Sequence, residues 1–160
     1  MSALGTIKKE AEEIEQESAI AAKAHFIDSR RWHKRNLYIG MPATILAAIA
    51  GVTAFGELPK EITGGVAMVV AALTAIGTFL SPADRATSHR TSSATFTEIR
   101  RNANLLKDVH AELADEGDKE GLNTLVKALE DLNSKMSQYE QGAQSLSTTA
   151  LGRARAELAS

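Results

Sequence analysis

The sequence of 160 residues contains no cysteine. A disulfide framework, a thiolate metal site and a cysteine nucleophile are therefore excluded. The absence fits a protein whose bulk faces a reducing cytosol. Asp, Glu, Lys, Arg and His are also missing from residues 37–55 and 62–80. Ionisable groups inside membrane helices are the usual mark of proton relays and coupled transporters, so their absence argues against both classes.

The usual signatures of enzyme sites are missing as well. No glycine-rich phosphate loop, nucleophile elbow or paired-carboxylate arrangement stands out. The four histidines, His25, His33, His89 and His110, lack the spacings of helical metal sites. The sequence therefore predicts no catalytic residue, no cofactor and no metal site. His33 and His89, which lie among arginines beside the apolar runs, are interpreted as interfacial polar residues.

The two uncharged runs dominate the organisation of the chain. Each has about 19 residues, and at roughly 1.5 Å per helical residue each would span about 28 Å, close to the thickness of a bilayer core. A buried hairpin of a soluble bundle is the alternative, but its helices would each need a polar face, and neither run has one. We therefore predict a transmembrane hairpin over residues 37–80, in contact with membrane lipid.

The distribution of positive charge predicts the orientation of this hairpin. Basic residues flank it on both outer sides, at Arg30, Arg31, Lys34, Arg35, Arg85 and Arg90. The connecting loop has only Lys60 beside Glu57 and Glu61. The positive-inside rule therefore places both termini in the cytoplasm. The six basic residues are topology determinants on the simpler interpretation, and they would ring the cytoplasmic mouth if the hairpins form a pore.

Small residues recur every four positions in both runs. They are Ala43, Ala47 and Gly51 in the first run and Ala67, Ala71 and Ala75 in the second. Such spacing lets helices approach closely in lipid, either within one hairpin or between hairpins in a ring. The candidate pore-lining polar residues are Thr44, Thr53, Thr74 and Thr78. Threonines in membrane helices more often bond their own backbone.

The flanking segments predict helices that pack together in the cytoplasm. Residues 1–36 form the first, with an apolar stripe at Leu4, Ile7, Ala11, Ile14, Ser18, Ala21 and His25. Residues 81–114 form a helix capped by Ser81, with a stripe at Phe96, Ile99, Ala103 and Leu106. A break is expected over residues 115–121.

Residues 121–160 form the last helix and a tail, with a stripe at Leu122, Leu125, Leu129, Leu132, Met136 and Tyr139. Residues 150–159 are expected either to form a short helix or to fray. The fold class is thus all-α, a membrane hairpin with a cytoplasmic helical bundle or coiled-coil hairpin. Residues 102–160 carry ten acidic against six basic side chains, which disfavours nucleic acid as a partner.

Several of these features together resemble the SLATT family, two-helix membrane effector domains of bacterial conflict systems. The resemblance covers about residues 21–106. The matching residues are Ala24-His25-Phe26, Tyr38-Ile39-Gly40-Met41-Pro42, the two spans rich in small residues, Phe79-Leu80-Ser81-Pro82, His89-Arg90 and Phe96.

The resemblance implies a protein that is not an enzyme but an oligomerising effector of the bacterial inner membrane. It implies antiviral defence by pore formation or membrane disruption, triggered by a nucleotide signal or by a partner protein that synthesises or senses a nucleotide. The alternative hypothesis is a membrane-anchored helical scaffold that recruits a cytosolic partner.

Overall fold

The computed structural model describes residues 2–54, 60–111 and 118–160, and all secondary structure among them is helical. The elements are α1 (Ala3–Ala54), α2 (Lys60–Leu80), α3 (Pro82–Leu105), η1 (Leu106–His110), α5 (Lys119–Gly142) and α6 (Thr148–Ala159). The predicted all-α class is confirmed. The chain forms two compact units: the core unit, Met1–Asp28 with Ser88–Ser160, and the hairpin unit, Ser29–Thr87.

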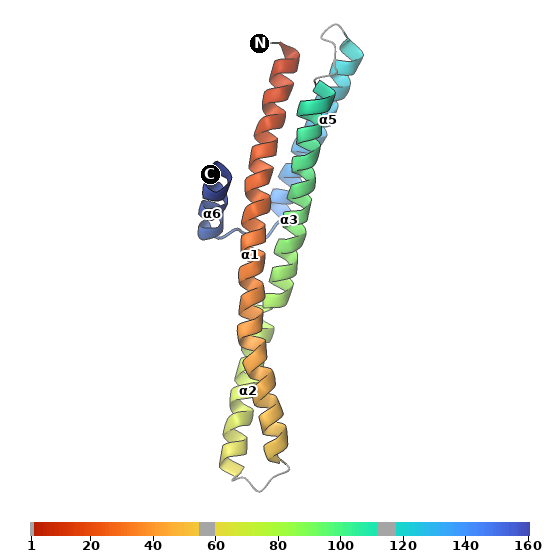
Figure 1. Cartoon of the computed structure of the whole chain (residues 1–160). Coiled ribbons are helices and arrows are strands. Elements are labelled where there is room, and N and C mark those ends of the chain that lie inside the picture. Colours follow the sequence, from red (N-terminus) through yellow and green to blue (C-terminus); the bar gives the residue numbers. More distant parts are fainter. Residues whose placement is uncertain (1, 55–59, 112–117) are drawn as a thin grey trace. The chain divides into compact units, whose positions relative to one another are not determined.

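The core unit is built where the predicted apolar stripes of α1, α3 and α5 meet (Figure 1). Ile7, Phe96 and Leu129, one from each helix, are at most 7% exposed and belong to one cluster. The remaining buried members of that cluster are Ala11, Ile14, Ile99, Ala103, Leu106, Leu125, Leu132 and Met136. The three-and-four spacing in the sequence therefore identifies the core correctly. Tyr139 departs from it, because its side chain is 46% exposed.

A π-helical turn, η1, follows α3 directly. This wider turn keeps Leu106 in the core, at 3% exposure. The helix α5 begins after Asp118, whose carboxylate accepts the backbone N–H of Glu120 at 3.1 Å as an N-cap. Gly121 lies within the first turn of α5, so the break predicted over residues 115–121 is wrong at this end. Leu113 and residues 115–117 lie outside the described residues.

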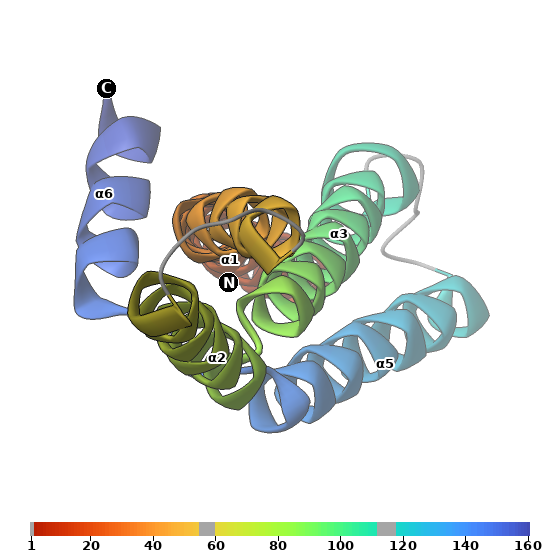
Figure 2. The same ribbon diagram turned by 90° about the horizontal axis from the view of Figure 1, so that it is seen from below.

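The C-terminal segment forms a docked helix. Figure 2 shows α6 against α1, on the side away from α3 and α5. Ala24 of α1 and Ala150 and Ala154 of α6 are fully buried in a second, smaller cluster. Because alanine has so small a side chain, the two helix backbones can pack closely along this line. Of the two expectations for residues 150–159, the helix is therefore correct.

In the hairpin unit, α2 runs back alongside the second part of α1 (Figure 1). Half-buried residues recur at three- and four-residue steps along both helices and mark the line where they face each other: Ile39, Ala43, Leu46 and Ala50 on α1, and Thr63, Val66, Val70, Leu73, Gly77 and Leu80 on α2. A Cβ atom at Gly77 would lie 3.5 Å from Cγ2 of Ile39. The hairpin is thus closed by aliphatic and small side chains.

Ser81 separates α2 from α3 with a backbone φ of 40°. A non-glycine residue in the left-handed region carries strain. The Ser81 hydroxyl donates to the carbonyl of Thr78 at 2.9 Å, back into the last turn of α2. The predicted capping of α3 by the Ser81 side chain is therefore wrong, although the position of the helix boundary is right.

Truncation of a core leucine should destabilise the core unit strongly. Leu129→Ala removes a side chain that is 7% exposed, and we expect a loss of about 2–5 kcal/mol in the free energy of unfolding. Val126→Ala, one turn earlier on α5, removes a side chain that is 40% exposed and should cost clearly less. Denaturant unfolding of both variants in detergent micelles, followed by circular dichroism, measures the difference. Equal losses would contradict this description of the core.

Candidate functional site: an apolar hairpin and a buried histidine pair

The surface of the hairpin unit is apolar on its outward face. Val52, Met68 and Phe79 are 75%, 76% and 88% exposed. Other exposed large hydrophobic residues of the unit are Leu37, Tyr38, Met41, Ile45, Ile49, Ile62, Val69 and Ile76. So many exposed apolar side chains on two helices indicate contact with a membrane or with another protein. Two helices of the chain are long and apolar enough to cross a membrane, by length and composition.

The six small residues proposed for helix packing do not share one environment. Ala43 is half-buried on the line between α1 and α2. The other five, Ala47, Gly51, Ala67, Ala71 and Ala75, are exposed. Packing of α1 against α2 therefore uses Ala43 and leaves the remaining small residues on the outside of the hairpin.

The candidate pore-lining threonines bond within their own helices. The hydroxyls of Thr44, Thr74 and Thr78 donate to the carbonyls four residues earlier, at 2.8–2.9 Å. Their side chains are exposed. The side chain of Thr53 lies outside the described residues. These bonds satisfy each hydroxyl without water, as expected of threonines in apolar helices.

The basic residues of the hairpin unit gather at Trp32. The guanidinium carbon of Arg35 lies 4.6 Å from the centre of the Trp32 ring, and that of Arg85 lies 4.8 Å from it. Arg85 comes from α3, so this cation–π cluster ties α3 to α1. Of the other basic residues, Arg30, Lys34 and Arg90 are exposed and Arg31 is half-buried. Arg90 belongs to the core unit.

A buried histidine pair lies in the core unit. His25 of α1 and His89 of α3 are 1% and 2% exposed, and their Nδ1 atoms are 2.9 Å apart. One Nδ1 must carry a proton and donate a hydrogen bond to the other Nδ1, which accepts it. Two neutral histidines must therefore adopt different tautomers, one protonated at Nδ1 and the other at Nε2. The ring of Phe96 stacks on His25, with centroids 5.5 Å apart. The interpretation of His89 as an interfacial residue is therefore wrong, because the side chain is enclosed between α1 and α3.

Burial sets the titration of His25. The pKa of His25 is lowered to about 4, mainly by loss of solvation and then by the charge of His89, while Asp28 opposes the shift. Protons on both Nδ1 atoms would place two N–H donors face to face in the core. The 2.9 Å separation therefore requires a single Nδ1 proton, shared between the two rings.

One helical turn beyond His25, Asp28 fastens α6. Its carboxylate is buried and accepts the backbone N–H of Ser147 at 2.8 Å and the Ser147 hydroxyl at 2.7 Å. Ser147 in turn caps α6, since its Oγ accepts the N–H of Ala150 at 3.2 Å. Glu157, further along α6, pairs with Lys23 of α1 at 2.7 Å, and this hydrogen bond lowers the pKa of Glu157. The histidine pair and the docking of α6 are therefore neighbours on α1.

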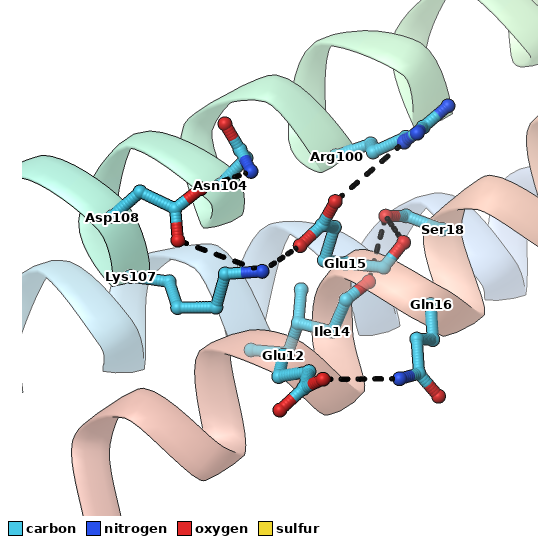
Figure 3. A network of polar contacts seen from close by, with 9 residues as sticks. All are labelled: Glu12, Ile14, Glu15, Gln16, Ser18, Arg100, Asn104, Lys107 and Asp108. Carbon is cyan, nitrogen blue, oxygen red and sulfur yellow. Dashed lines mark hydrogen bonds and ion pairs between the residues drawn. The ribbon is translucent and has the colours of Figure 1, made fainter. Parts of the chain in front are cut away.

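A second polar network joins α1 to the π-helical turn (Figure 3). Lys107 of η1 donates to Glu15 of α1 at 2.7 Å and lies 3.7 Å from Asp108. The hydrogen bond to Glu15 raises the pKa of Lys107. Arg100 of α3 reaches the other Glu15 oxygen at 4.0 Å. This network fixes the rotation of α3 and η1 relative to α1.

The pairing of His25 with His89 escaped sequence reasoning, although a signal was present. The apolar stripe of α3 extends backward from Phe96 by a further seven residues to His89, which places His89 on the buried face. His25 already lay on the stripe of α1. The docking of α6 left no comparable signal, because its buried residues are two alanines in a polar segment.

Metal binding finds no support in the described part of the chain, where no three His, Cys, Asp or Glu side chains converge on one point. Comparison of the chain with family models, with curated proteins and with solved structures gives no match.

Acidification should destabilise the core unit through His25. The folded-state pKa of about 4 lies below the ordinary histidine pKa of 6.5, so the unfolded chain binds the proton more tightly. Stability should fall as the pH drops from 6.5 towards 4, by roughly 3 kcal/mol for this group. Denaturant unfolding at a series of pH values, followed by circular dichroism, measures the loss.

Two variants assign that loss to one residue. His25→Gln should remove this part of the pH dependence, whereas His33→Gln changes an exposed histidine and should retain it. A pH dependence that survives unchanged in His25→Gln would refute the assignment.

Proposed function

We propose that the protein is an oligomerising effector of a bacterial inner membrane, which forms a pore or disrupts the bilayer in a conflict or anti-phage system. Residues 37–80 cross the membrane as a hairpin, both termini are cytoplasmic, and the core unit is the cytoplasmic part. The observation that carries the proposal is the outward-facing apolar surface of the hairpin unit, with Val52, Met68 and Phe79 at least 75% exposed. Lipid is the environment in which such a surface is stable.

The exposed small residues support oligomerisation. The contact between α1 and α2 leaves five small residues exposed: Ala47 and Gly51 on α1, and Ala67, Ala71 and Ala75 on α2. Small residues on an outer face allow close approach of a second hairpin, which is how helices associate where the hydrophobic effect supplies little. A lumen bounded by such helices would be uncharged and would discriminate ions poorly.

On this proposal, a trigger would act on the core unit. There α1 meets α3 at the His25–His89 pair and meets the start of α6 at the hydrogen bonds between Asp28 and Ser147. A nucleotide-synthesising or nucleotide-sensing partner protein is the source of the trigger that the family resemblance implies.

A membrane-anchored scaffold is the second candidate function, and a groove in the core unit favours it. The groove lies between α1 and α5 and has a volume of about 730 Å³. Its floor includes Ile7 and Leu129, and its rim is acidic, with Glu10, Glu13, Glu17 and Glu130. A basic amphipathic helix of a cytosolic protein would fit this lining. On this hypothesis, replacing both spans by an unrelated hairpin preserves function.

Blocking the small-residue face should abolish pore activity. Ala71→Trp places a bulky ring on the exposed face of α2, and we expect it to remove the depolarisation caused by the native chain. Val69→Trp is the matched control, because Val69 is 50% exposed but lies two residues away, on another side of the helix. A potential-sensitive dye follows depolarisation in bacteria, and membrane fractionation checks insertion of all three chains.

The outcomes separate the hypotheses. Depolarisation by the native chain and by Val69→Trp, but not by Ala71→Trp, supports an assembled pore. Equal depolarisation by both tryptophan variants would contradict assembly through the small residues. A native chain that inserts without depolarising the membrane favours the scaffold.

A further inference from the structure

We infer that Trp32, Arg35 and Arg85 form a binding site for the headgroup of an anionic glycerophospholipid. The inference rests on the proposed membrane function and adds to it a specific lipid class and the residues that select it. Trp32 and Arg35 are three residues apart on α1 and so share one face of that helix. Arg85 reaches the same ring from α3.

Among the residues that the structure describes, the two arginines have no neutralising partner. In residues 2–54, 60–111 and 118–160, no ion pair or hydrogen bond engages the guanidinium of Arg35 or Arg85. Their stacking on Trp32 holds two positive charges at a single ring, 4.6 and 4.8 Å from its centre. Repulsion between these charges is relieved by an anion.

The stacked geometry leaves the arginines suited to phosphate. A guanidinium that lies over an aromatic ring uses its face in the contact, and its N–H donors at the edge remain available. Those donors form a planar fork that matches two phosphate oxygens. Both arginine side chains are exposed, and Trp32 is half-buried between them and the helices.

The surface beside the site accommodates the rest of a lipid. Leu37 and Tyr38 follow the cluster on α1, and Phe79 precedes it on α2; they are 50%, 77% and 88% exposed. Acyl chains can lie along these side chains while the headgroup meets Arg35 and Arg85. A tryptophan at the level of the headgroups is the usual position for that side chain in membrane proteins. Charge favours an anionic over a zwitterionic headgroup, by about 1 kcal/mol per basic residue, or roughly five-fold.

Trp32 is the only tryptophan of the chain, so its fluorescence reports on this site alone. The full-length protein is reconstituted in phosphatidylcholine bilayers that contain a fixed fraction of a brominated lipid, either phosphatidylglycerol or phosphatidylcholine. Bromine quenches an indole in contact with the acyl chains. We expect brominated phosphatidylglycerol to quench Trp32 several-fold more than brominated phosphatidylcholine.

Variants assign the preference to the two arginines. In the double variant Arg35→Gln, Arg85→Gln, the two brominated lipids should quench Trp32 equally. Arg101→Gln removes an exposed arginine from α3 in the core unit and should keep the native ratio.

Equal quenching of the native chain by the two lipids, or loss of the preference in Arg101→Gln, would overturn the inference and leave the membrane proposal intact. If neither lipid quenches Trp32, the inference fails, and fractionation of the same chain with membranes decides the membrane proposal separately.

Discussion

The outward-facing apolar side chains of α1 and α2 constrain everything else in this protein. Over residues 37–52 and 62–80, neither helix of the hairpin unit has a charged face, and the exposed side chains that would be costly in water include Val52, Met68 and Phe79. The contact between α1 and α2 is narrow, because small and aliphatic residues such as Ala43 and Gly77 form it. On the proposed function this surface lies in lipid, where helix is the backbone form that satisfies its own hydrogen bonds.

The core unit is stabilised in a different way, by an apolar cluster framed with buried polar contacts. Phe96 lies in the cluster and stacks on His25, so the apolar core and the histidine pair are continuous. In the described residues every buried side-chain nitrogen or oxygen has a partner. Three polar contacts of the core unit join helices: His25 with His89 links α1 to α3, Asp28 with Ser147 links α1 to α6, and Glu15 with Lys107 links α1 to η1. Since α1 takes part in all three, it is the element against which the other helices of the core unit are positioned.

Most of the fold could be predicted from the sequence, because regular spacing reports burial directly. The stripes that contain Ile7, Phe96 and Leu129 predicted the core, and the uncharged runs predicted the hairpin helices. Features that depend on pairing between distant segments could not be predicted, as with His89, because the arginines around it in the sequence suggest an interfacial position. The outward position of Ala47 and Ala71 also required the structure, since four-residue spacing is the same for an internal and an external contact. The Ser81 side chain was expected to cap α3 on local sequence preference, but it turns back to Thr78.

The central claim is that the hairpin unit spans a membrane with both termini on the cytoplasmic side. The chain has no cysteine, so single introduced cysteines can be located without background. We would label intact cells with a membrane-impermeant maleimide, comparing Glu57→Cys in the loop with Ser160→Cys at the C-terminus. The account predicts labelling of Glu57→Cys in intact cells and of Ser160→Cys only after the cells are opened. Labelling of Ser160→Cys in intact cells, or recovery of the chain in the soluble fraction, would contradict it.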